Sequence, residues 1–172
     1  MPLEIIFGNI IETEADAIVN AANENLQIGG GVCGAIFAAA GVNKLKEACN
    51  KIGFCETGNA VITKAYNLPS KYIIHAVGPI WAGGNNNEET LLYNCYINAI
   101  SLAVQNDCLS IAFPVISSGI FGYPKESALK IALLAISNSL LTYDINISLV
   151  IFDREIFNMA ERVLLDIQKS YN

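Results

Sequence analysis

The stretch DAIVNAANENLQIGGGVCGAI, residues 16–36, joins a β-rich run to a helical pattern through a loop with three consecutive glycines. Ala17 to Asn20 is a strand candidate and Val32 to Ala40 is a helix candidate. The segment Asn23 to Gly34, called the first loop below, therefore lies where a strand gives way to a helix. In an open α/β sheet, ligands usually lie in the crevice beyond the carboxyl ends of the strands. This stretch predicts an α/β fold with a binding site at the loop.

The remaining sequence repeats this alternation, which is typical of helices packed on both faces of a sheet. The other strand candidates are Leu3 to Phe7, Asn59 to Lys64, Tyr72 to Ala76, Ser110 to Pro114 and Ile147 to Phe152. The other helix candidates are Asn43 to Lys51, Glu88 to Asn106, Lys125 to Leu141 and Ile156 to Lys169. No internal repeat or linker divides the sequence, so a single domain over residues 1–172 is expected.

Composition narrows the class of protein. Apolar residues make up 53% of the sequence and charged residues 15%, so a large core is expected rather than disorder. The first ten residues lack the basic start and apolar stretch of a signal peptide, and no run of about eighteen apolar residues could span a membrane. We therefore expect a cytoplasmic protein with no membrane partner.

Charge and cysteine usage argue against two further kinds of site. The net charge of −6 includes no basic run, so bulk nucleic acid is not an expected partner. A metal site is not expected either, because only one histidine could join the cysteines and no Cys-x-x-Cys pair is present. The five cysteines are Cys33, Cys49, Cys55, Cys95 and Cys108.

A second loop, Ser117 to Tyr123 with the sequence SSGIFGY, also follows a strand candidate and runs into a helix. Glycines let a backbone approach a ligand closely, and amides in the first turn of a helix attract anions. A lone glycine run would favour a mere flexible turn, but two such loops favour a phosphate site. Neither loop contains a lysine or a nucleotide fingerprint, so backbone amides and the Ser117 and Ser118 hydroxyls would meet a phosphate that is bound rather than transferred.

Several blocks resemble the macrodomain family in order and spacing. The resemblance is carried by Asp16–Asn23 (DAIVNAAN), Gly29–Ile36 (GGGVCGAI), Ile74–Pro79 (IHAVGP) and Ser110–Gly122 (SIAFPVISSGIFG). It implies a three-layer α/β/α fold with a mixed central sheet and ADP-ribose across the carboxyl edge of that sheet. It implies no cofactor.

The resemblance also implies a role for each matching position. Asn9 and Ile10 would meet the adenine edge, Phe152 would stack on adenine, and Asn23 would contact the distal ribose. The first loop would hold the diphosphate and the distal ribose through Gly30, Gly31, Val32 and Cys33. The second loop would hold the diphosphate from the other side through Ser117, Ser118, Gly119, Ile120 and Phe121.

These roles compete with ordinary structural ones. Asparagines often cap or bridge turns, which is the role we favour for Asn20, whereas for Asn23 we favour ligand binding. Without the resemblance, Phe121 and Phe152 would be interpreted as core residues. His75 lies in an apolar strand candidate with no serine or cysteine partner that the sequence places beside it, so we interpret it as structural.

The chain departs from the family pattern at two positions. Asn9 stands where many members have an aspartate, and its amide oxygen is a weaker acceptor for the adenine amino group. Cys33 stands where hydrolytic members often have the aspartate of Gly-Gly-Val-Asp-Gly-Ala-Ile-His, so the usual water-positioning acid is absent. A helix start could activate the Cys33 thiol, but no assigned base lies near it, so we expect Cys33 mainly to shape the loop.

The resemblance implies an enzyme that hydrolyses mono-ADP-ribosyl-protein esters, O-acetyl-ADP-ribose or both, with Asn23 and Phe121 as the catalytic-site residues. The alternative is a non-catalytic reader of ADP-ribose or of ADP-ribosylated proteins, which would use the same side chains. A phosphatase acting on ADP-ribose phosphate would use the same pocket too.

Overall fold

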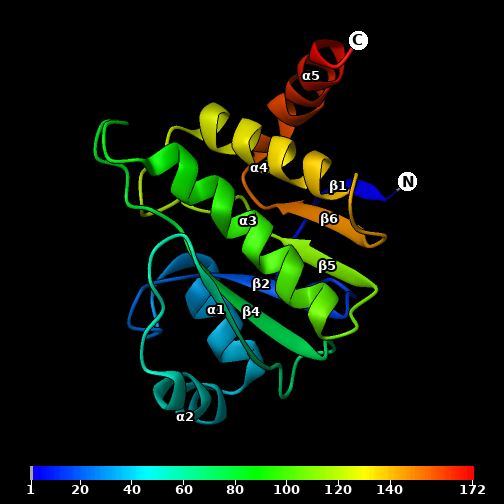
Figure 1. Cartoon of the computed structure of the whole chain (residues 1–172). Helices are drawn as coiled ribbons and strands as arrows, with labels where there is room; N and C mark the ends of the chain where they lie inside the picture. The colour runs from blue at the N-terminus through cyan, green and yellow to red at the C-terminus, as the bar shows by residue number, and fades with distance from the viewer. Residues whose placement is uncertain (1) are drawn as a thin grey trace.

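A six-stranded mixed sheet lies between two layers of helices in the computed structural model, which describes residues 2–172 (Figure 1). The strands lie in the order β1-β6-β5-β2-β4-β3, and β3 alone runs antiparallel to its neighbour. Their bounds are β1 (Leu3–Phe7), β2 (Ala17–Ala22), β3 (Ala60–Lys64), β4 (Tyr72–Val77), β5 (Ser110–Phe113) and β6 (Asn146–Ile151). The predicted α/β/α architecture with a mixed sheet is confirmed.

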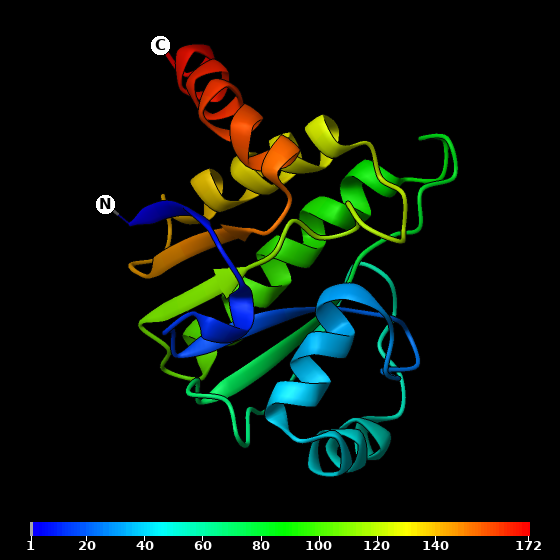
Figure 2. The same ribbon diagram turned by 180° about the vertical axis from the view of Figure 1, so that it is seen from behind.

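Within residues 2–172, five α-helices cover the two faces of the sheet. The front and back views show how they are arranged (Figures 1 and 2). The helices α1 and α2 lie on one face, and α3, α4 and α5 lie on the other. Their bounds are α1 (Gly31–Ala40), α2 (Val42–Ile52), α3 (Glu88–Gln105), α4 (Lys125–Ser139) and α5 (Arg154–Ser170), and a 3-10 turn, η1, spans Ile10–Glu12. Within residues 2–172 no helix is long and apolar enough to cross a membrane.

Alternate residues of the central strands face opposite helix layers. Val19 of β2 and Ile74 of β4 pack with α3 and α4, whereas their neighbours Ile18 and Ile73 pack with α1. Because successive side chains of a strand point to opposite faces, both faces of these strands must be apolar. This double burial explains why the chain combines so many apolar residues with so few charged ones.

The parallel strands bring the two loops to one edge of the sheet. The first loop follows β2, the second loop follows β5, and Phe152 follows β6, so all three leave neighbouring strands at their carboxyl ends. The structure begins α5 two residues earlier than the sequence pattern predicted. The reason is Asp153, whose carboxylate accepts from the amides of Glu155 and Ile156 and so caps the helix.

A row of buried polar side chains crosses the sheet beneath this edge. Asn20 Nδ2 lies 3.0 Å from His75 Nδ1, and the other ring nitrogen, Nε2, lies 3.0 Å from Thr63 Oγ1. Thr63 Oγ1 donates to the Lys64 carbonyl, so Nε2 carries the ring proton and Nδ1 accepts from Asn20. Burial lowers the pKa of His75 to about 4, which keeps the ring neutral. His75 is thus buried as expected, but Cys49 Sγ lies 3.9 Å from its Nε2, a neighbour that the sequence did not place there. The turn role expected for Asn20 is wrong, because Asn20 lies within β2, opposite His75.

The low pKa of His75 makes stability depend on pH. The pKa of an unfolded histidine is near 6.5, whereas that of folded His75 is about 4. As pH falls below about 6.5, the unfolded state therefore binds a proton that the folded state does not bind, and the free energy of unfolding decreases. Urea unfolding of the wild type should lose about 2 kcal/mol between about pH 7.5 and 5 from this group alone. The free energy of unfolding of the variant His75→Gln should not show this loss over the same pH range. Equal losses in the two proteins over this window would show that another group is responsible.

Candidate functional site

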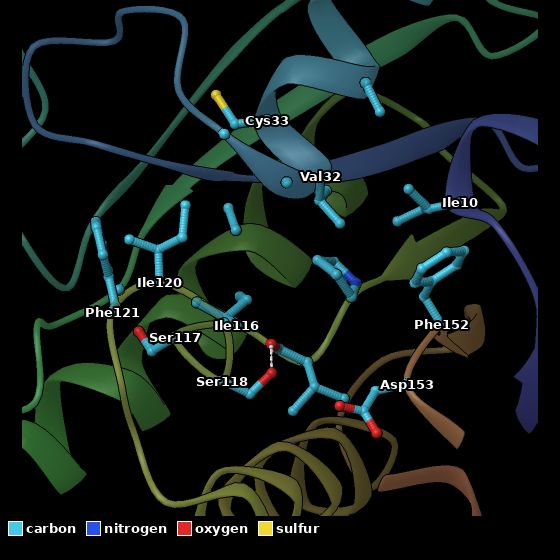
Figure 3. A pocket seen from close by; sticks show the side chains of 18 of the residues that line it. Ile10, Val32, Cys33, Ile116, Ser117, Ser118, Ile120, Phe121, Phe152 and Asp153 are labelled. Carbon is cyan, nitrogen blue, oxygen red and sulfur yellow. Dashed lines mark hydrogen bonds between the residues drawn. The ribbon is translucent and has the colours of Figure 1, made fainter. Parts of the chain in front are cut away.

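A cavity of about 580 Å³ opens where the carboxyl ends of β2, β5 and β6 meet (Figure 3). Every residue to which the family resemblance assigns a ligand contact lines it: Asn9, Ile10, Asn23, Gly30, Gly31, Val32, Cys33, Ser117, Ser118, Gly119, Ile120, Phe121 and Phe152. The close-up places Val32 and Cys33 on one side and Ser117 and Ser118 on the opposite side. Residues more than a hundred positions apart in the chain thus share one cavity.

The first wall is the start of α1. This helix begins at Gly31, and its N-cap residue, Gly30, has no side chain to bond the first-turn amides. Such amides lack partners within a helix and carry partial positive charge. Because Gly31, Val32 and Cys33 also line the cavity, this helix start can receive an anion.

The second wall is a tight turn that also leaves polar groups without partners. Ser118 Oγ donates to the Val115 carbonyl at 2.7 Å, the dashed line of Figure 3, and the Tyr123 amide donates to the Ser117 carbonyl at 2.9 Å. Within residues 2–172 the amides of Gly119, Ile120 and Phe121 donate to no protein acceptor, and the buried Ser117 hydroxyl has no partner. The Ser117 hydroxyl is buried, where a polar group without a partner is costly, and the exposed Gly119 and Ile120 amides are free to donate, so a ligand that accepts hydrogen bonds fits this wall.

The two walls lie close together at the mouth of the cavity. A Cβ atom added to Gly30 would lie 2.9 Å from Ile120 Cδ1. A ligand between the walls can therefore receive hydrogen bonds from both, as the sequence predicted for a diphosphate. Neither wall contributes a lysine or an arginine, so the positive potential comes from the backbone.

One end of the cavity carries an exposed aromatic ring. Phe152 is 76% exposed, which makes the alternative interpretation as a core residue wrong. Its ring lies beside the buried side chain of Ile10, and Phe121 lies at the opposite end of the cavity (Figure 3). An exposed ring on a fixed backbone offers a flat apolar surface for a planar base.

Asp153, which the sequence analysis did not select, fixes the backbone next to Phe152. Besides capping α5, its carboxylate lies 2.8 Å from Lys125 Nζ, and this bond holds the pKa of Asp153 below its usual range. An aspartate directly before a helical pattern is a helix-start signal, so the sequence did contain the information needed to find it.

The two asparagines of the site have structural hydrogen bonds as well as a place in the cavity. Asn9 Oδ1 accepts from the Ile11 amide at 3.3 Å and so caps η1. Asn23 bridges a turn: its Oδ1 accepts from the Gln27 amide, and its Nδ2 donates to the Gln27 carbonyl at 2.8 Å. A side-chain amide has two hydrogens and two lone pairs on oxygen, so each asparagine keeps capacity for a ligand.

Cys33 lies closer to His75 than the sequence could reveal. Its Sγ is 3.7 Å from Asn20 Nδ2, and the same nitrogen contacts the His75 ring. Asn20 separates the thiol from the imidazole, however, and an amide does not pass a proton between them. The Cys33 Sγ also lies 3.7 Å from the Gln27 carbonyl oxygen, so this residue ties the first loop to the sheet.

The other cysteines do not supply a reactive thiol. Burial raises the pKa of Cys49 to about 11 and that of Cys95 to about 12, and it also raises the pKa of Cys55 and Cys108. Within residues 2–172 no three side chains of the His, Cys, Asp or Glu type gather in a way that could hold a metal ion.

Comparison with known proteins identifies the family. Residues 19–132 match the family model of the Macro domain. The chain is 44% identical to an O-acetyl-ADP-ribose deacetylase of Escherichia fergusonii over 168 residues, 94% of each chain. It is 51% identical over 138 residues, 80% of each chain, to a Macro domain-containing protein of Chlorobaculum tepidum. The Oceanobacillus iheyensis macrodomain with ADP superposes with a TM-score of 0.93 at 39% identity, covering 98% of this chain and 92% of that one. The chain belongs to the Macro domain family.

The packing of the first loop generates a prediction about Gly34 in α1. Alanine inside a helix normally gains stability over glycine, but a Cβ at Gly34 would lie 2.8 Å from the Gly29 carbonyl oxygen. Gly34→Ala should therefore lower the stability by about 1–3 kcal/mol, because the loop backbone must move. Thermal melting without ligand measures the change. Gly119→Ala is the matched control, since a Cβ there meets nothing within 4 Å. A Gly34→Ala protein as stable as the control would show that the loop yields freely.

Proposed function

We propose that this chain binds ADP-ribose along the cavity and hydrolyses mono-ADP-ribosyl-protein esters, O-acetyl-ADP-ribose or both. The observation that carries the proposal is the pair of facing walls with unpaired amides, between an exposed aromatic ring at one end and Phe121 at the other, with Asn23 also in the cavity lining. A dinucleotide-like ligand with a central diphosphate has the matching order of groups. The deacetylase of Escherichia fergusonii and the ADP-bound Oceanobacillus iheyensis structure support it.

Each part of the ligand has an assigned contact. Adenine stacks on Phe152 beside Ile10, and Asn9 offers its amide at the edge of the base. The diphosphate lies between the start of α1 and the second loop, where fixed amides stabilise negative charge without having to reorganise. The distal ribose then reaches the end of the cavity at which Phe121 lies, and Asn23 is its second assigned contact.

Hydrolysis at this end requires that water and sugar be held in a fixed geometry. Water breaks the ester, and the products are ADP-ribose and a carboxylic acid. Asn23 orients the distal ribose hydroxyls and Phe121 confines the sugar, so the reacting bond and the water meet in a fixed arrangement. A ligand phosphate oxygen helps to position the water, and Cys33 keeps the first loop in place through its contacts with Asn20 and Gln27.

Solved variants of the Oceanobacillus iheyensis macrodomain add support for these positions. The variants replace an asparagine, a glycine seven positions later, and an aspartate ten positions after the asparagine. In this chain the same spacing leads from Asn23 to Gly30 and Cys33. The residues under study in that protein thus have counterparts that line the cavity here, with cysteine in place of the aspartate.

One observation favours the alternative of a non-catalytic reader. Among the residues that line the cavity, the only carboxylate is Asp153, and it is engaged by Lys125 and the first amides of α5. No free carboxylate is therefore available there as a general base. A turnover experiment decides between the two functions.

Affinity for ADP-ribose tests the binding site. Removing the stacked ring with Phe152→Ala should weaken binding by about ten- to a hundredfold, the range expected for loss of one base stack. Isothermal calorimetry in EDTA measures both proteins, and Phe152→Tyr, which keeps a ring, is the control. The removed ring is exposed, so Phe152→Ala should stay folded. Wild-type affinity in a folded Phe152→Ala protein would mean that adenine binds elsewhere, and no binding by the wild type would reject the proposal.

Turnover separates the roles of Asn23 and Cys33. Release of ADP-ribose from a mono-ADP-ribosylated protein should be mostly lost in Asn23→Ala, because the sugar is no longer held, yet remain measurable in Cys33→Ala. A Cys33→Ala protein that binds ADP-ribose normally but releases none would identify the thiol as the catalyst. A wild type that binds ADP-ribose tightly and releases none from any such substrate would be a reader.

A further inference from the structure

The segment Trp81–Asn87, called loop 81–87 below, joins β4 to α3 and lies outside the cavity lining. It is exposed except at the half-buried Trp81. Gly83, Gly84 and Asn87 all have φ values between 58° and 92°, in the left-handed region that most residues avoid. A loop of this kind needs contacts from outside its own backbone to hold one conformation.

Glu88, the first residue of α3, supplies those contacts. Its side chain is only 2% exposed. One carboxylate oxygen accepts from the amides of Ala82 at 3.0 Å and Gly84 at 2.8 Å, and the other accepts from the amide of Asn86 at 2.6 Å. No cation pairs with it within residues 2–172. Bonds from backbone amides, that of Ala82 foremost, hold the pKa of Glu88 below its usual range, and a helix start also favours negative charge.

Trp81 connects this loop to the second loop of the site in two ways. Its amide donates to the Phe121 carbonyl at 2.8 Å, and its ring lies 4.7 Å from the Tyr123 ring, centroid to centroid. Gly84 packs against the indole so closely that a Cβ there would lie 3.0 Å from it. The amide bond from Gly84 to Glu88 therefore sets the backbone against which Trp81 rests.

These contacts act on the distal-ribose end of the second loop. Ser118, on the diphosphate side, is held separately by its bond to the Val115 carbonyl. Phe121, which we assign to the distal ribose, is the residue that receives the Trp81 amide. We propose that Glu88 is a positioning residue for the distal-ribose end of the site, acting through loop 81–87 and Trp81 on Phe121. This inference rests on the proposed binding of ADP-ribose.

Comparing two ligands separates positioning from general support of the fold. ADP has the adenine and the diphosphate but lacks the distal ribose, so it reports on the rest of the site. In E88Q, an NH₂ group replaces one acceptor oxygen, so the side chain can no longer accept from all three amides. Affinity for ADP-ribose should fall about tenfold in E88Q, while affinity for ADP should stay within about twofold of wild type. E89Q removes the same charge from the adjacent, exposed position and should leave both affinities unchanged.

The single tryptophan of the chain gives an independent readout. Trp81 emission without ligand should shift in E88Q and not in E89Q, because only Glu88 holds the loop against the indole. E88A should lose more affinity for ADP-ribose than E88Q does. Circular dichroism and melting confirm that each variant is folded. If neither Glu88 variant folds, Gly84→Ala, whose Cβ would press on the indole, should lose affinity for ADP-ribose and keep its affinity for ADP.

Three results would overturn the inference. In the first, folded E88Q binds both ligands as the wild type does; in the second, it loses affinity for ADP and ADP-ribose equally. Unchanged binding by Gly84→Ala, in the case where it is needed, would also reject it. Failure of the wild type to bind ADP-ribose would instead reject the proposed function, a result that the calorimetry of the wild type alone reveals.

Discussion

Unpaired backbone amides at the carboxyl edge of the sheet are the constraint around which the rest of the site is arranged. Amides at the start of α1 and in the second loop point to one cavity, and no lysine or arginine shares it. Backbone dipoles can hold an anion between the two walls only if the distance between the walls is fixed. That distance is set by the hydrogen-bonded order β5-β2-β4 and by the double-sided core, which fixes each strand from above and below.

Several contacts outside the cavity maintain this arrangement. The Asn20 amide, held by His75 in the core, touches Cys33 in the first loop. On the other side, Trp81 bonds to the Phe121 carbonyl. The first loop is thus held from behind by the Asn20 side chain and the second by the backbone amide of Trp81, and neither residue lines the cavity. These contacts use none of the unpaired amides of the cavity, which therefore stay free for a ligand.

The sequence was sufficient for the fold and for the ligand-contact residues assigned by resemblance, all of which line the cavity, but not for Asp153. Strand and helix patterns are strong here because both faces of the sheet are buried, and the loop blocks carry the family resemblance.

The sequence could not provide the geometry of contacts between distant residues. The link from Cys33 through Asn20 to His75 depends on strand register, in which Asn20 of β2 lies opposite His75 of β4. The exposure of Phe152 likewise depends on where β6 ends, since most phenylalanines are buried. Nothing in the sequence singled out Glu88, because its three amide bonds come from a loop whose conformation is not encoded in any periodic pattern.

Asp153 connects the C-terminal helix to the cavity. The same carboxylate caps α5 and, with Lys125, fixes the backbone from which the Phe152 ring extends. The packing of the C-terminal helix and the position of the Phe152 ring are therefore linked, since local opening of α5 would release the residue that anchors the ring. A ligand stacked on Phe152 would favour the docked helix by mass action. The seventeen residues of α5 thus share one anchor, Asp153, with the end of the cavity at which the Phe152 ring lies.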